Sequence, residues 1–213
     1  MDVKDINGKQ VNVPMMVITL IVGTFITVLN QTILSTAFPT LMKAFDISTA
    51  TVQWLSTGFM LVNGIMIPVS AYLSAKVPSK WLYMSAMGTF FVGTLVAFVA
   101  NSFAILLAGR LIQAVGVGIT MPLLQNIMMS IFPPNRRGAA MGMAVIAIGV
   151  APAIGPTLSG YIIDNFGWRV LFGMILPIAG LVIIAALFFF KNVLPLSNPK
   201  LDVPSLIESS IGF

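Results

Sequence analysis

The sequence contains no cysteine and no histidine, and only 8% of its 213 residues are charged. Without cysteine, the chain has no disulfide and no thiolate metal site, and it carries no sign of its redox compartment. Without histidine or an acidic cluster, we expect no metal site. The chain also offers no pair of nucleophile and base, so we expect neither enzyme activity nor a bound cofactor.

The scarcity of charge excludes a soluble domain, in which about 25% of residues are charged. Here 58% of the residues are hydrophobic and the mean hydropathy is +1.01, which predicts an integral membrane protein with the lipid bilayer as its first partner. The net charge of +5 does not indicate nucleic-acid binding, because the basic residues are scattered in loops rather than gathered on one face.

Six apolar runs joined by short polar segments predict an all-α bundle of six transmembrane helices. The first run is too long for the core of a signal peptide, which spans roughly 7–15 residues. We expect the last turn of the fourth run, residues 129–132, to leave the membrane. The runs are Pro14–Phe38, Ser48–Ser74, Trp81–Ala100, Phe103–Phe132, Gly138–Ile163 and Val170–Phe190.

The chain divides into a tail over residues 1–13, the six-helix bundle over 14–190, and a segment over 191–213. This last segment resembles a linker followed by the start of a seventh helix, which predicts that the chain is part of a longer protein. A natural protein with six spans is the alternative.

Lysine and arginine are unevenly divided between the two sides of the predicted bundle. Eight lie on the side of the tail and two, Lys43 and Arg169, on the other. Because basic loops stay in the cytoplasm, we expect a multi-pass protein of the cell membrane with both ends cytoplasmic. The eight are Lys4, Lys9, Lys76, Lys80, Arg136, Arg137, Lys191 and Lys200.

The fifth run has too many glycines and prolines to be a good helix in water, but neighbouring helices make such a composition tolerable in lipid. Its small residues recur every four positions, which predicts a bent helix that packs closely against a neighbour. One row is Ala147, Ala151, Gly155 and Ser159, and a second is Pro152, Pro156 and Gly160.

Arg110 is the only basic residue inside an apolar run, and no acidic residue lies well inside one. A mid-helix arginine costs about 2.5–3.5 kcal/mol on insertion scales, so it indicates a functional site. Asn30 is expected at a similar depth and Gln113 lies one turn from Arg110, which predicts a polar cluster lining an interior cavity. A snorkelling arginine and an ordinary interhelical amide hydrogen bond, worth about 0.6 kcal/mol, are the alternatives.

Weaker candidates are the polar and aromatic residues of the second and fourth runs. Asn63, Gln125 and Asn126 are candidates to line the same path as Arg110. Trp54 fits two roles equally well, an anchor at the membrane interface or a wall of the cavity.

Four segments together resemble the major facilitator superfamily, and within it the EmrB/QacA-like drug:proton antiporters with fourteen spans, closest to the lincomycin-resistance type. Each segment is similar to a motif of that subfamily, and the four occur in the expected order. They are LNQTILSTAFP from Leu29 to Pro39, RLIQAVGVG from Arg110 to Gly118, GPTLSG from Gly155 to Gly160, and FGWRVLFGMILP from Phe166 to Pro177.

The resemblance implies the amino-terminal half of a transporter built from 3+3 inverted repeats, driven by the proton gradient. Its partners would be protons, amphipathic drugs and the absent carboxy-terminal half. The arginine at Arg110 would lie in the central cavity and act in proton coupling. The fifth helix would pack against the other bundle through the antiporter motif, which here comprises Gly149, Pro152, Gly155, Pro156 and Gly160.

Two motifs depart from the family pattern. The signature aspartate of the first helix is Asn30, which cannot carry a proton. In the loop Ala71–Lys80, Ala75 replaces the usual aspartate, and only Leu73, Lys76 and Lys80 fit the motif well. The cytoplasmic charge lock of the family is therefore not expected in this half.

The favoured function is proton-coupled efflux of neutral or weakly charged amphipathic compounds, because no acidic partner for a cation is visible in the spans. Two alternatives remain open: a major facilitator importer of a nutrient, and an accessory half that does not transport by itself. The row containing Pro152, Gly155 and Pro156 argues against the importer, because it is typical of antiporters.

Overall fold

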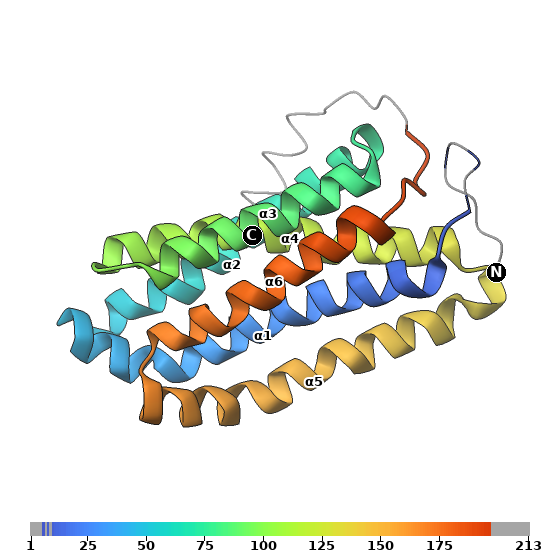
Figure 1. Ribbon diagram of the computed structural model, residues 1–213. Coiled ribbons are helices and arrows are strands. Elements are labelled where there is room, and N and C mark those ends of the chain that lie inside the picture. The colour runs from blue at the N-terminus through green and yellow to red at the C-terminus, as the bar shows by residue number, and fades with distance from the viewer. Residues whose placement is uncertain (1–5, 7, 9, 197–213) are drawn as a thin grey trace.

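The computed structural model describes residues 6, 8 and 10–196, which form six α-helices (Figure 1). Each helix is long and apolar enough to cross a membrane, so the six predicted spans are all present. The predicted start of a seventh helix lies outside the described residues, as does most of the tail. The helices are α1 Val13–Phe45, α2 Thr49–Lys76, α3 Ser79–Phe98, α4 Phe103–Ile131, α5 Pro134–Phe166 and α6 Arg169–Phe189.

Two helices extend by about a turn or more beyond the apolar runs that predicted them. α1 continues through Pro39 to Phe45 and is capped by Asp46, whose backbone is left-handed (φ 51°) and whose N–H donates to the carbonyl of Met42. α5 begins at Pro134, where a proline fits because the first helical turn needs no N–H donor. Hydropathy marks only the apolar part of a helix, so it misses polar turns at either end.

Short polar segments define where three of the helices begin. Asn12, Ser48 and Ser102 each accept a hydrogen bond from the backbone N–H three residues later, at the starts of α1, α2 and α4. Such caps satisfy N–H groups that the first turn of a helix leaves without partners. The connections between the helices are short, and successive helices run antiparallel.

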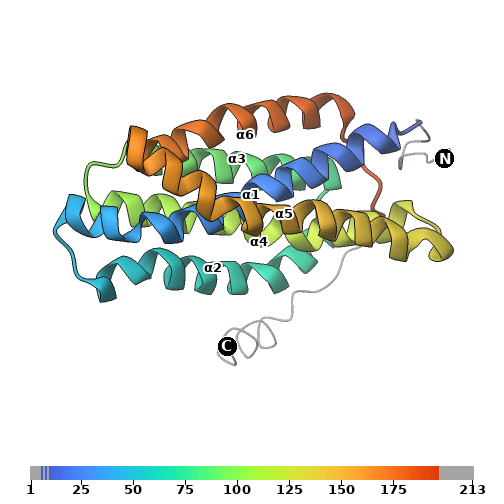
Figure 2. The same cartoon turned by 90° about the horizontal axis from the view of Figure 1, so that it is seen from below.

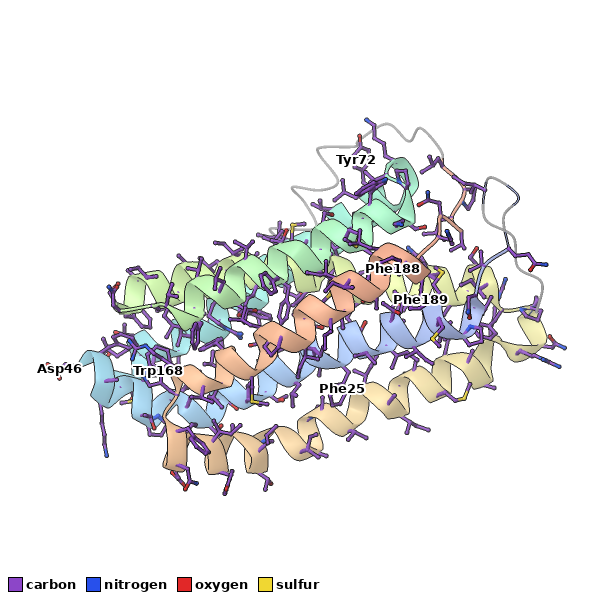
Figure 3. The ribbon with its side chains drawn as sticks, in the orientation of Figure 1. Phe25, Asp46, Tyr72, Trp168, Phe188 and Phe189 are labelled. Carbon is purple, nitrogen blue, oxygen red and sulfur yellow. The ribbon has the colours of Figure 1, made fainter. Side chains whose placement is uncertain are left out.

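The connections gather at two opposite ends of the bundle. Those after α1, α3 and α5 lie at one end, and those after α2 and α4 lie at the other, together with the segment preceding α1 and the segment following α6 (Figure 1). Asp46 and Trp168 mark the first end and Tyr72 the second (Figure 3). This alternation is what six successive membrane crossings require.

α1 and α4 form the centre of the bundle. α1 packs against α2, α4, α5 and α6, and α4 packs against α1, α2, α3 and α5. α2 and α6 lie on opposite flanks when the bundle is turned by 90° (Figure 2). Polar side chains on the inner faces of α1 and α4 are therefore shielded from lipid.

Glycines bring two helix backbones into their closest contact between α3 and α4, and not at α5. A Cβ on Gly93 would lie 2.6 Å from the backbone nitrogen of Gln113, and one on Gly109 would lie 2.8 Å from that of Ala97. A Cβ on Gly116 would collide with the carbonyl oxygen of Ala86. Small residues at a helix contact are the usual means of close packing in membranes. Here they place Gln113 against α3.

The two small-residue rows of α5 face different surroundings. Ala151, Gly155 and Ser159 are buried, and the Ser159 hydroxyl contacts that of Thr36 on α1. A Cβ on Gly155 would lie 2.5 Å from Thr32 Oγ1. The implied packing of Gly155 against another bundle is therefore wrong, because this row already packs against α1. α5 is a single uninterrupted helix across both internal prolines.

Candidate functional site: a buried arginine beside a cavity

Arg110 lies on α4 and is the largest fully buried side chain among the described residues, with 1% of its surface exposed. Its Nη1 donates hydrogen bonds to Asn30 Oδ1 of α1 at 2.7 Å and to Gln113 Oε1 at 2.8 Å. The predicted contact among these three residues is present. A snorkelling arginine is excluded, because the guanidinium is directed into the bundle rather than towards its end.

A hydrogen-bonded chain continues from Gln113 into α3. Gln113 Nε2 donates to Thr94 Oγ1 at 2.8 Å, and the Thr94 hydroxyl donates to the carbonyl of Phe90 at 2.7 Å. Because Nε2 of Gln113 is bound to Thr94, the amide of Gln113 is oriented with its Oε1 towards Arg110. The sequence gives no signal for Thr94, because a threonine in a span usually bonds only to its own helix.

Phe59 of α2 covers one face of the guanidinium. The Arg110 Cζ lies 4.3 Å from the centroid of the Phe59 ring, within the range of a cation–π interaction. Such a contact is worth about 2 kcal/mol when desolvated. One phenylalanine among 15 in an apolar sequence gives no signal of this role, so only the packing of α2 on α4 reveals it.

The positive charge of Arg110 has no acidic partner in the part of the chain that the structure describes. The two acidic residues described, Asp46 and Asp164, are exposed near helix ends. Arg110 Nε and Asn30 Nδ2 are both buried without a hydrogen-bond partner. The site therefore holds a cation balanced only by amide oxygens and an aromatic face.

A cavity of about 380 Å³ lies beside Arg110, between α1, α2, α4 and α5. Arg110 and Phe59 line this cavity, whereas Asn30 and Gln113 do not. The two amides hold the guanidinium in place while it faces the cavity. The other lining residues are Val28, Gln31, Thr32, Ser35, Ser56, Met60 and Pro152.

The structure does not bring the weaker candidates to this cavity. Trp54 is 55% exposed on α2, and Asn63 contacts α4 near Gly118. Gln125 lines a separate apolar cavity of about 310 Å³ between α1, α4 and α5. Asn126 lines a third cavity, at the end of the bundle that carries Tyr72. None of the three cavities described is lined by more than one of these four residues.

The residues of the loop motif bind locally. Lys76 Nζ donates to Tyr72 Oη of its own helix at 2.9 Å, and Lys80 Nζ donates to the carbonyl of Leu187 near the end of α6 at 2.6 Å. Leu73 is half-buried and its carbonyl accepts the N–H of Val77. Within the described residues, the motif forms no ion pair.

An antiparallel bundle of six membrane-spanning helices, with a cavity beside a buried charge, is the architecture of a multi-pass membrane protein. Residues 20–209 match the Major Facilitator Superfamily, and the chain belongs to this family. Members of this family are transporters, so the chain is not an enzyme.

The chain is similar to two curated proteins of Bacillus subtilis. It is 47% identical over 209 residues to the uncharacterized MFS-type transporter YhcA, covering 97% of this chain and 39% of that protein. It is 41% identical over 206 residues to the lincomycin resistance protein LmrB, covering 97% of this chain and 43% of that protein. The chain thus spans about two fifths of the length of these relatives.

The fold is shared with a solved structure, the human organic anion transporter MFSD10 (TETRAN). The TM-score is 0.77 at 16% identity, and the match covers 94% of this chain and 54% of that one. At this identity the likeness concerns the fold alone.

Proposed function

We propose that this chain is the amino-terminal bundle of a proton-coupled exporter of amphipathic small molecules that works by alternating access. The observation that carries this proposal is Arg110, a buried charge beside a cavity near the centre of the bundle. Transporters of this architecture bind substrate near the membrane midplane. The relative named for lincomycin resistance supports the assignment to drug efflux.

The proposed energy source is the proton gradient, with no bound cofactor. Arg110 is the proposed coupling residue, because a fixed cation alters the proton affinity of nearby acids. Asn30 occupies the position of the family aspartate and cannot be protonated in its place. The carboxylate that exchanges the proton is therefore expected in the rest of the transporter.

The proposed substrates are neutral or weakly charged amphipathic molecules. The cavity combines hydroxyl and amide groups with apolar surface, which suits compounds bound mainly by burial. Among the described lining residues, the only charge is the positive one of Arg110. A cationic substrate would be repelled there.

The second bundle is the proposed partner of the exposed row of α5. A Cβ on Gly149 or Gly160 would meet nothing within 4 Å, and Pro152 and Pro156 are exposed. Such a surface lets another helix approach closely. We further propose that the protein lies in the cell membrane with both ends cytoplasmic, because Lys76, Lys80 and the other basic residues of that end outnumber Lys43 and Arg169.

The test is efflux of Nile red, an uncharged amphipathic dye, from cells that express the full-length protein containing this chain. We expect faster efflux than in control cells, with a protonophore abolishing the difference. Arg110→Ala should reduce the rate at least tenfold at equal expression, because it removes the buried charge. Arg136→Ala, at the exposed start of α5, should leave efflux unchanged.

The alternatives predict different results. Faster accumulation of substrate would indicate an importer, and unchanged flux in either direction would indicate an accessory protein. Normal efflux by the Arg110→Ala variant would remove Arg110 from the mechanism.

A further inference from the structure

Within the described residues, one edge of the Arg110 guanidinium makes no hydrogen bond. An arginine carries five N–H donors, two of them on Nη1. Both recorded hydrogen bonds of Arg110 start from Nη1, and they end on Asn30 and Gln113. Nε is buried without a partner. An arginine edge formed by Nε and Nη2 can bind a carboxylate through two parallel hydrogen bonds.

The groups that surround Arg110 supply no negative charge. Asn30 and Gln113 are neutral amides, and Phe59 covers one face of the guanidinium. Within the described residues no carboxylate lines the cavity. An isolated buried charge is costly unless it is paired, so the site favours a ligand that brings the opposite charge.

The cavity beside Arg110 has the size and lining for an amphipathic ligand. Its volume of about 380 Å³ is at the lower end of the range of small-molecule sites, roughly 300–1,000 Å³. Val28, Phe59 and Met60 offer apolar surface, and Ser35 and Ser56 offer hydroxyl groups. A compact ring system with one acidic substituent fits this combination.

We propose that this cavity binds an amphipathic organic anion, with the substrate carboxylate paired with the Arg110 guanidinium where it lines the cavity and its apolar body against Phe59 and Met60. The proposal narrows the proposed substrates from neutral or weakly charged amphipathic molecules to those that carry one acidic group, and it rests on the proposed function for the direction of transport. The substrate's carboxylate supplies the negative charge that Asn30 cannot. Asn30 is thus a specificity-determining residue, because an aspartate there would neutralise Arg110 from within the protein.

The test measures equilibrium binding to the full-length protein in lipid nanodiscs by fluorescence polarisation. The probes are 7-(diethylamino)coumarin-3-carboxylate, its uncharged primary amide, and a cationic trimethylammonioethyl amide. We expect the carboxylate to bind at least tenfold more tightly than the amide, and the cation to bind more weakly still. Asn30→Asp should lower carboxylate affinity at least tenfold and leave amide affinity within about twofold.

Gln125→Glu is the matched control, since it adds a carboxylate to α4 at a different cavity. It should leave the preference for the carboxylate intact. Equal binding of the carboxylate and the amide by the unaltered protein would overturn the proposal, and this comparison decides the question even if Asn30→Asp does not fold. Unchanged carboxylate binding by a folded Asn30→Asp protein would also overturn it.

Binding is measured without a proton gradient, so its result is separate from that of the efflux assay. A preference for the carboxylate in a protein that exports nothing would support the anion site and refute the exporter. Efflux of Nile red without any preference for the carboxylate would refute the anion site alone.

Discussion

At the scale of the residue, the buried cation depends on a small set of neutral partners. Gln113 accepts from Arg110 and donates to Thr94, so a single side chain links α4 with α3 and fixes the guanidinium. Asn30 provides the second acceptor from α1. An arginine held in this way is oriented without being neutralised, which leaves its charge available to the cavity.

Gln113→Leu should lower the free energy of unfolding by about 1–3 kcal/mol, because it leaves one buried N–H of Arg110 unpaired. The measurement is the thermal unfolding midpoint of the full-length protein in nanodiscs. Gln125→Leu is the control, because Gln125 is exposed on the same helix. Equal midpoints for the two variants would show that the bond to Gln113 does not stabilise the fold.

At the scale of the element, close contact between α3 and α4 decides where Gln113 and Arg110 sit. Gly93 and Gly109 face each other, and Gly116 faces Ala86. A side chain at any of these glycines would push the two backbones apart. Such a displacement would move Gln113 away from Thr94 and loosen the whole cluster.

Gly116→Ala should destabilise the protein by about 1–3 kcal/mol, because its Cβ would collide with backbone rather than with a flexible side chain. Gly142→Ala should instead stabilise it by up to about 1 kcal/mol, since alanine favours helix and a Cβ there meets nothing within 4 Å. Opposite shifts of the unfolding midpoint in nanodiscs are expected. An unchanged or raised midpoint for Gly116→Ala would contradict the α3–α4 contact.

A second contact between elements joins the start of α3 to the end of α6. Asn192 Oδ1 accepts the backbone N–H of Lys80 at 3.0 Å, and Lys80 Nζ donates to the carbonyl of Leu187 at 2.6 Å. Pro78, which precedes α3, provides no side-chain cap of its own. The first turn of α3 thus gains an acceptor from the segment after α6, and the last turn of α6 gains a donor from Lys80. Lys80 and Asn192 are 112 positions apart in the sequence.

Asn192→Ala should cost about 0.5–2 kcal/mol of stability, the usual range for losing a helix cap. Thermal unfolding of the full-length protein is the measurement. Asn101→Ala, in the exposed α3–α4 connection, should have no effect. An unaltered midpoint for Asn192→Ala would show that α3 needs no cap from the segment after α6.

At the scale of the whole molecule, the six helices place most of the described basic loop residues at one end. Lys76, Lys80, Arg136, Arg137 and Lys191 lie at that end, and Lys43 and Arg169 lie at the other. The bundle therefore has a fixed electrostatic polarity along its axis. This polarity predicts its orientation in the membrane.

Single cysteines test the orientation, because the chain contains none of its own. Lys43→Cys should react with a membrane-impermeant maleimide in intact cells, and Arg136→Cys only after permeabilisation. Any cysteines elsewhere in the full-length protein are first replaced by serine. The reverse pattern of labelling would place both ends of this bundle outside the cytoplasm.

The sequence by itself determined the class of the molecule, its six spans and the contact between Arg110 and Asn30. Those properties follow from composition, from the length of apolar runs and from depth along a helix, which depend on one segment at a time. The contact of Arg110 could be predicted because a charged residue in an apolar run is rare.

The tertiary structure alone decided that Phe59 covers Arg110, that Thr94 completes the hydrogen-bonded chain, and that Gly155 faces α1. It also separated the cavity of Arg110 from those of Gln125 and Asn126. In a chain whose helices are apolar on every side, hydrophobicity does not tell a helix which face to bury. That choice is made by the fit of small residues and polar groups between pairs of helices, and it exists only once the helices are packed together.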